Sequence, residues 1–86
     1  MTSPLIIERA AKVSGYTVDA LRGPSRLRSI CMVRWAVMAV LRARGLSLAT
    51  IGRLMNRDHT TVISGLERAD RLRRDASFAS LLEAIA

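Results

Sequence analysis

The sequence predicts an all-α fold, a compact bundle of five to six helices that contains a helix-turn-helix. Apolar residues recur at spacings of three and four along most of the chain, and no stretch shows the alternation of a strand. Hydrophobic residues make up 50% of the chain and aromatic residues only 3%, so the core must consist of aliphatic side chains. With 86 residues, the chain fits one domain, residues 1–86.

The expected elements follow from caps and breakers along the chain. Ser3 and Pro4 start the first helix, the Gly23-Pro24 pair stops a single short turn, and Ser25 opens the longest helix. That helix is apolar on nearly all sides, so we expect it to be central and buried. The expected helices lie at residues 4–13, 17–21, 25–44, 48–55, 58–72 and 77–85.

Two consecutive helices form the predicted helix-turn-helix. Residues 48–55 follow the N-cap Ser47, and residues 58–72 begin at Asp58, a natural N-cap for the second helix. Asn56 and Arg57 form the tight turn between them. In this motif the first residues of the second helix enter the major groove of DNA, and its later apolar residues anchor it to the domain.

The charge distribution points to a polyanion-binding face. The net charge is +7, and between Arg22 and Arg57 there are eight arginines and no acidic residue. A basic segment between balanced segments is typical of nucleic-acid binding. The alternative is that arginine merely replaces lysine on solvated helix faces, as a G·C-rich genome would favour.

Several function classes are excluded by composition. Cys31 is the sole cysteine and no Cys/His cluster is present, so neither a disulfide nor a metal site is expected, and no cofactor. The longest apolar run, residues 30–41, contains Arg34 and is about half the length of a membrane span. No secretory signal is visible, which predicts a cytoplasmic protein. No catalytic constellation is present, so we do not expect an enzyme.

The start of the second helix carries side chains suited to reading duplex DNA. Asp58 can accept from a cytosine amino group, His59 can donate to a base or phosphate, and Thr60 and Thr61 offer hydroxyls and methyls. For Asp58 a pure capping role is the alternative. For His59 the alternative is a solvent-facing residue without a DNA contact.

These residues belong to a motif that resembles the C-terminal DNA-binding domain of the bacterial replication initiator DnaA. The segment from Arg57 to Ile63 reads Arg-Asp-His-Thr-Thr-Val-Ile and follows Ile51-Gly52. Upstream, residues 33–38 resemble the family's Pro-Arg-Gln-x-Ala-Met segment, and residues 18–21 resemble its Val-x-Asp-Leu turn. The resemblance covers roughly residues 5–75.

The resemblance implies a set of DNA contacts. Arg34 would reach into a narrow, A·T-rich minor groove, while the residues from Asp58 to Thr61 read the adjacent major groove. For Arg34 the alternative is a side chain that extends from the core to solvent. The implied phosphate contacts are Arg26, Arg28, Ser47 and Thr50, together with Arg53 and Arg57, which also offset the charge of Asp58.

The sequence also departs from the family pattern. Asn56 stands alone where the family has Gly-Gly, and Asn tolerates the left-handed backbone that such a turn requires. Trp35 replaces a glutamine, and we expect it to serve packing or a partner surface. No G-x-x-x-x-G-K-[ST] motif occurs, so the initiator's ATPase activity is not expected of this chain.

Two functions remain as hypotheses. The first is sequence-specific binding to double-stranded DNA at sites related to those of the initiator, by a bacterial or phage regulator of replication initiation or transcription that associates with the nucleoid. The second is a protein-interaction module that binds the replication initiator or another replication protein through Trp35 and the apolar tail, residues 78–85. The resemblance implies a monomer on DNA, and a dimer through the last helix is the alternative.

Overall fold

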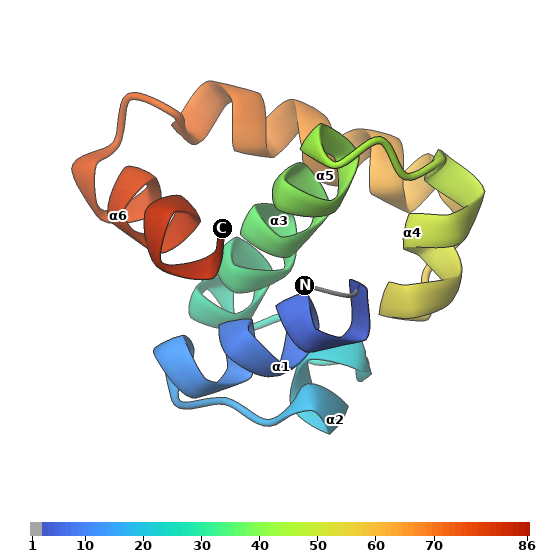
Figure 1. The fold of residues 1–86 in the computed structure, drawn as a ribbon, viewed down its shortest axis with the longest axis horizontal. Coiled ribbons are helices and arrows are strands. Elements are labelled where there is room, and N and C mark those ends of the chain that lie inside the picture. The colour runs from blue at the N-terminus through green and yellow to red at the C-terminus, as the bar shows by residue number, and fades with distance from the viewer. Residues whose placement is uncertain (1–2) are drawn as a thin grey trace.

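The computed structural model describes residues 3–86, and within that range it contains six helices and no strand (Figure 1). This confirms the predicted all-α class. The helices are α1 (Ser3–Ser14), α2 (Val18–Arg22), α3 (Arg28–Ala43), α4 (Leu48–Met55), α5 (His59–Leu72) and α6 (Ala76–Ile85).

Helix α3 forms the centre of the bundle, as its apolar sequence predicts. It packs against each of the other five helices, and Figure 1 shows it running through the middle with α5 across one side and α1 across another. Its fully buried side chains include Val37, Met38 and Leu41. Every other helix is therefore positioned by its contact with α3.

The start of α3 differs from the prediction. Ser25 does not open the helix: α3 begins at Arg28, and residues 24–27 form a non-helical loop. The hydroxyl of Ser25 accepts a hydrogen bond from the amide of Leu27 at 3.3 Å. Pro24 precedes this turn, and Ser25 turns its carbonyl toward the side chain of Arg34. The loop is therefore organised by a long-range contact that helix propensity alone does not reveal.

Helix α6 completes the core against α1 and α3. Asp75 caps it by accepting from the amide of Phe78 at 3.0 Å, and both Phe78 and Ile85 are fully buried. Two apolar side chains of the tail therefore lie inside the domain, while Leu81 and Leu82 are only partly buried.

No helix among residues 3–86 is long and apolar enough to cross a membrane. Over the same range, no group of three or more His, Cys, Asp or Glu side chains lies close enough together to hold a metal ion.

Candidate nucleic-acid interface

The turn between α4 and α5 is held tightly by its backbone. Asn56 adopts a left-handed conformation, with φ of 56°, and ends α4. The next amide, of Arg57, donates to the carbonyl of Gly52 at 2.8 Å. A Cβ on Gly52 would collide with the carbonyl oxygen of Arg57, so only glycine permits this close approach. The single Asn56 thus replaces the family's glycine pair without opening the turn.

The first turn of α5 presents polar side chains to solvent. Asp58 caps the helix: its Oδ1 accepts from the amide of Thr61 at 2.9 Å and from the hydroxyl of Thr60 at 2.6 Å. His59, Thr60 and Thr61 are all exposed, whereas Val62 is fully buried and anchors the helix. The capping role of Asp58 is therefore present, and a base contact by the same carboxylate remains a prediction.

Hydrogen bonding keeps Asp58 ionised. The hydroxyl of Thr60, followed by the amide of Thr61, lowers the pKa of the Asp58 carboxyl to about 2. At neutral pH the side chain is an acceptor only. The Thr60 hydroxyl donates to this carboxylate, so its lone pairs are what it offers to a base amino group.

The start of α4 carries a second exposed group of hydrogen-bonding side chains. Ser47 caps this helix, accepting from the amide of Thr50 at 3.1 Å and donating to its hydroxyl at 2.9 Å. Arg53 also donates to the Thr50 hydroxyl, at 3.1 Å. With both lone pairs of that oxygen used, the Thr50 proton remains to donate outward. The phosphate contacts predicted for Ser47, Thr50 and Arg53 suit this geometry and stay predictions.

Two hollows bring the candidate residues together. The first, between α4 and α5, is lined by Arg53, Asp58 and His59, among others. The second lies between the α2–α3 loop and α5, and both Arg26 and Thr61 line it. Arg26 and Arg28 are exposed, as a phosphate contact requires. The loop, the turn and the first turn of α5 therefore border one continuous region of the surface.

Arg34 does not belong to that exposed set. Its side chain is only 6% exposed and donates to four backbone carbonyls: Leu21 at 2.7 Å, Ala20 at 3.0 Å, Gly23 at 2.7 Å and Ser25. A further contact, from Nη1 to Sγ of Cys31, measures 3.9 Å.

These five contacts match the five N–H donors of a guanidinium, so none is left for DNA. In this structure the guanidinium of Arg34 is therefore not available for the expected minor-groove contact, and the side chain does not extend to solvent either. Burial, and then the charge of Arg57, lower its pKa.

Arg57 is likewise turned inward. Its Nη1 donates to the carbonyls of Arg22 at 3.1 Å, Asn56 at 3.0 Å and Met55 at 3.2 Å, and its Nη2 donates to Gly23. The side chain is half-buried rather than free. Arg57 thus ties the helix-turn-helix to the α2–α3 loop, and the N–H groups that it uses there are turned away from the phosphate contact expected for it.

Trp35 and Arg68 form a contact that sequence reasoning missed. The guanidinium of Arg68, on α5, lies 5.2 Å from the ring centroid of Trp35, on α3, a cation–π distance. Gly65 lets the two helices approach here, because an added Cβ would lie 3.1 Å from Cδ1 of Trp35. Trp35 is half-buried, so the packing role expected for it fits. The sequence did carry one signal for Arg68: it follows Thr61 by seven residues, which is about two turns of the same helix.

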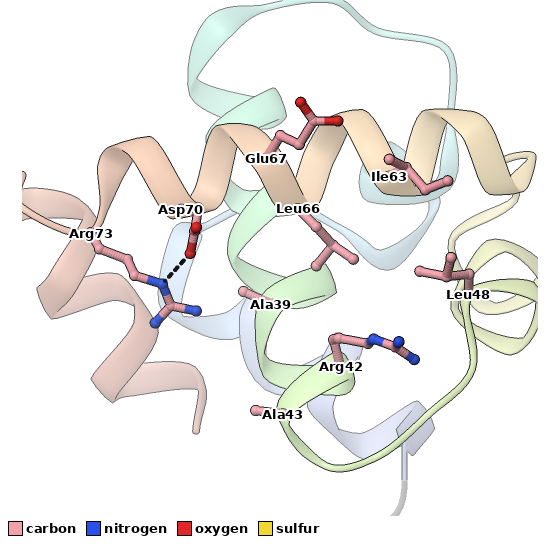
Figure 2. A pocket seen from close by; sticks show the side chains of 9 residues that line it. All are labelled: Ala39, Arg42, Ala43, Leu48, Ile63, Leu66, Glu67, Asp70 and Arg73. Atoms are coloured by element: carbon pink, nitrogen blue, oxygen red, sulfur yellow. Dashed lines mark hydrogen bonds and ion pairs between the residues drawn. The ribbon is translucent and has the colours of Figure 1, made fainter.

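A separate groove lies between α5 and the C-terminal end of α3 (Figure 2). Leu48, Ile63 and Leu66 contribute apolar side chains to it, and Arg73 binds Asp70 with an Nε–Oδ1 distance of 3.0 Å. The candidate DNA-contacting residues do not line it, so the groove lies apart from the interface described above.

The sequence of this chain is similar to those of known proteins. Residues 4–68 match the family described as bacterial dnaA protein helix-turn-helix. The chromosomal replication initiator protein DnaA of Thermomicrobium roseum is 38% identical over 78 residues, which cover 87% of this chain and 17% of that protein. DnaA of a Picosynechococcus species is 36% identical over 70 residues, 79% of this chain and 16% of that protein. The chain thus spans less than a fifth of either relative, and it belongs to the bacterial DnaA helix-turn-helix family.

Proposed function

We propose that this chain binds double-stranded DNA sequence-specifically, at sites related to those of the bacterial replication initiator. It acts as a regulator or accessory factor of replication initiation or transcription, without ATPase activity, on DNA of the nucleoid. The observation that carries the proposal is the exposed polar first turn of α5, residues 58–61, on a helix anchored by the buried Val62.

The chemistry of that turn supports base reading in the major groove. Asp58 is ionised and Thr60 offers lone pairs, which suits amino groups of cytosine and adenine. His59 and Thr61 supply a ring N–H and a hydroxyl beside them. The exposed arginines Arg26, Arg28 and Arg53, with the hydroxyls of Ser47 and Thr50, would hold phosphates on either side.

Partner proteins have less support. Phe78 and Ile85 of the apolar tail are buried in the core, which leaves the partly buried Leu81 and Leu82 as the larger apolar side chains of α6 for a partner or a dimer. We therefore propose binding as a monomer. Contact with the initiator itself stays the alternative if DNA binding fails.

The experiment is selection from random duplexes at physiological salt, followed by measurement of specific and nonspecific affinity. We expect one enriched site, bound about 10³-fold or more tightly than random DNA. The double variant His59→Ala/Thr60→Ala should lose this preference and keep nonspecific binding, because its phosphate contacts and charge are intact.

Ser77→Ala is the matched control, since it removes an exposed hydroxyl from the first turn of a different helix, α6. It should leave the preference unchanged. A double variant that still selects the same site, or a wild-type chain that selects none, would overturn the proposal.

A further inference from the structure

Two arginines from different elements converge on one short segment of backbone. Arg34 of α3 donates to the carbonyls of Ala20, Leu21 and Gly23, and Arg57 of the helix-turn-helix donates to those of Arg22 and Gly23. Every carbonyl from residue 20 to residue 23 thus accepts from a guanidinium. Residues 20–22 are the last of α2 and Gly23 is its C-cap, so these carbonyls lie at the helix end, where the amides of a following turn are missing. The carbonyl of Ala20 also accepts from the amide of Gly23 at 3.3 Å.

The contacts continue into the loop that follows. Arg34 also binds the carbonyl of Ser25, and Pro24 between the two contacts has a fixed φ. Asn56 adds a hydrogen bond from its Nδ2 to the carbonyl of Arg22 at 3.3 Å. The loop of residues 23–27, which carries Arg26 and leads to Arg28, is therefore held at its start from both α3 and the turn before α5.

That Arg34 and Arg57 bind backbone carbonyls, and not acidic side chains, has an electrostatic consequence. An aspartate or glutamate would also hold these guanidiniums, but it would cancel their charge at the face where DNA is expected. Carbonyl oxygens hold the same groups and leave both positive charges in place. The C-terminal end of α2 favours cations as well, which offsets the repulsion between Arg34 and Arg57.

We propose that Arg34 and Arg57 are positioning residues that fix the α2–α3 loop, so that Arg26 and Arg28 are held ready for the DNA backbone in register with the first turn of α5. Neither Arg34 nor Arg57 touches DNA. This inference rests on the proposed function for its DNA consequence, while its structural half, a loop held rigid by two guanidiniums, stands on the free protein.

The first test uses Arg57→Lys, which keeps the charge but replaces the planar donor fork by a single ammonium. We expect it to weaken specific binding by roughly tenfold. The slope of log K against the logarithm of the salt concentration should become shallower, by up to about 2 if Arg26 and Arg28 both lose their phosphate contacts. Arg74→Lys is the matched control on an exposed arginine beyond the end of α5, outside the proposed interface. It should change affinity by less than about twofold, because the charge is kept and no proposed DNA contact is altered.

A double-mutant cycle separates positioning from direct contact. In the background Arg26→Ala/Arg28→Ala, the added change Arg57→Lys should cost little, because the residues that it positions are gone. Full additivity of the two losses would mean that Arg57 acts on DNA independently, and it would overturn the proposal.

The second test needs no DNA. Backbone ¹⁵N relaxation of Gly23, Ser25, Arg26 and Leu27 should show rigid-backbone order parameters, about 0.85, in the wild type and a fall toward about 0.6 in Arg57→Lys. Circular dichroism should show that the helices are retained. Arg34→Lys is made in parallel and should act in the same direction, so that one variant decides if the other does not fold.

The two tests distinguish this inference from the proposed function. A wild-type chain without a preferred site refutes the function, and the relaxation data still decide whether the loop is fixed. A loop that stays rigid in the lysine variants overturns the positioning role whatever the DNA measurements show.

Discussion

Asp58 caps α5, and we propose that the same carboxylate also reads a base. Its Oδ1 holds the first turn of α5 together through Thr60 and Thr61. An ionised acid at a DNA interface is electrostatically costly, and the N-terminus of α5 offsets part of that cost. The same hydrogen bonds that cap the helix therefore also keep the carboxylate in the charged form that a cytosine amino group would recognise.

The capping bonds make part of the stability of the domain depend on pH. The pKa of Asp58 is about 2 in the folded chain and about 3.9 in an unfolded one. Its contribution is fully present above about pH 4 and is lost as the pH falls toward 2. We predict that the unfolding free energy of the wild type exceeds that of Asp58→Asn at neutral pH, and that this difference shrinks between pH 4 and pH 2.

Urea titrations followed by circular dichroism at several pH values measure this difference. Thr60→Val removes the hydroxyl that contributes most to the low pKa, so it should move the acid-induced loss to higher pH. A difference between wild type and Asp58→Asn that does not vary with pH would contradict the assignment.

The residues whose roles were predicted correctly are those with local partners. Ser47 and Asp58 cap helices through amides three residues away, and Asn56 ends a helix by its own backbone conformation. The inward contacts of Arg34 and Arg57 were not predicted, because the carbonyls of α2 and of the following loop lie 9 to 35 residues away from them. Sequence spacing reveals an arginine in an apolar helix, but it does not reveal the unpaired end of α2 that receives it.

At the scale of elements, the close contact between α4 and α5 sets the geometry of the helix-turn-helix. Gly52 lies directly against the carbonyl of Arg57, while Gly65 lies against side chains of α3, with Sδ of Met38 2.5 Å from the position of an added Cβ. The two glycines thus serve two different contacts, one with backbone and one with side chains.

These contacts predict different costs for adding one methyl group. Gly52→Ala should destabilise the domain by about 1–3 kcal/mol and weaken DNA binding, because the backbone of the turn must move. Gly65→Ala is the matched control in the second helix. It should cost less, because the side chains of Met38 and Trp35 can shift, whereas the gain of about 1 kcal/mol for alanine over glycine in a helix applies to both variants.

Equilibrium unfolding of the two variants under identical conditions gives the comparison. Equal costs, or a larger cost for Gly65→Ala, would show that the turn is more adaptable than its backbone contacts indicate.

Helix positions were predicted well, and the boundaries near the loop were not. The periodicity of apolar residues placed α4 and α5 correctly, because their apolar faces pack against the core. The start of α3 was placed at Ser25 instead of Arg28, since a serine after proline is a common N-cap. In the structure, Ser25 lies in the non-helical loop before α3, and its carbonyl accepts a hydrogen bond from Arg34.

For the molecule as a whole, the last helix is part of the single hydrophobic core. Phe78 is the one phenylalanine of the chain and is fully buried between α6 and its neighbours. A domain of this size has a small total stability, on the order of 5–10 kcal/mol, so one large core side chain accounts for a considerable share of it.

We predict that Phe78→Ala lowers the free energy of unfolding by about 3–5 kcal/mol, because it leaves a cavity at the α1–α3–α6 contact. Chemical denaturation at low temperature, where the variant still folds, measures this loss. Ser80→Ala on the exposed side of α6 is the control and should change stability by less than about 0.5 kcal/mol. If Phe78→Ala changed the free energy of unfolding only slightly, the core role of the tail would be contradicted and its role as a partner surface favoured.

The meeting of α3 and α5 at Trp35 also has a practical consequence. Trp35 is the sole tryptophan, it is half-buried, and it lies under the guanidinium of Arg68 on α5. Its fluorescence therefore comes from one known place, the crossing of the central helix with the helix that would enter the groove. Emission wavelength and quenching can follow both unfolding and any movement of α5 on DNA, without an attached dye.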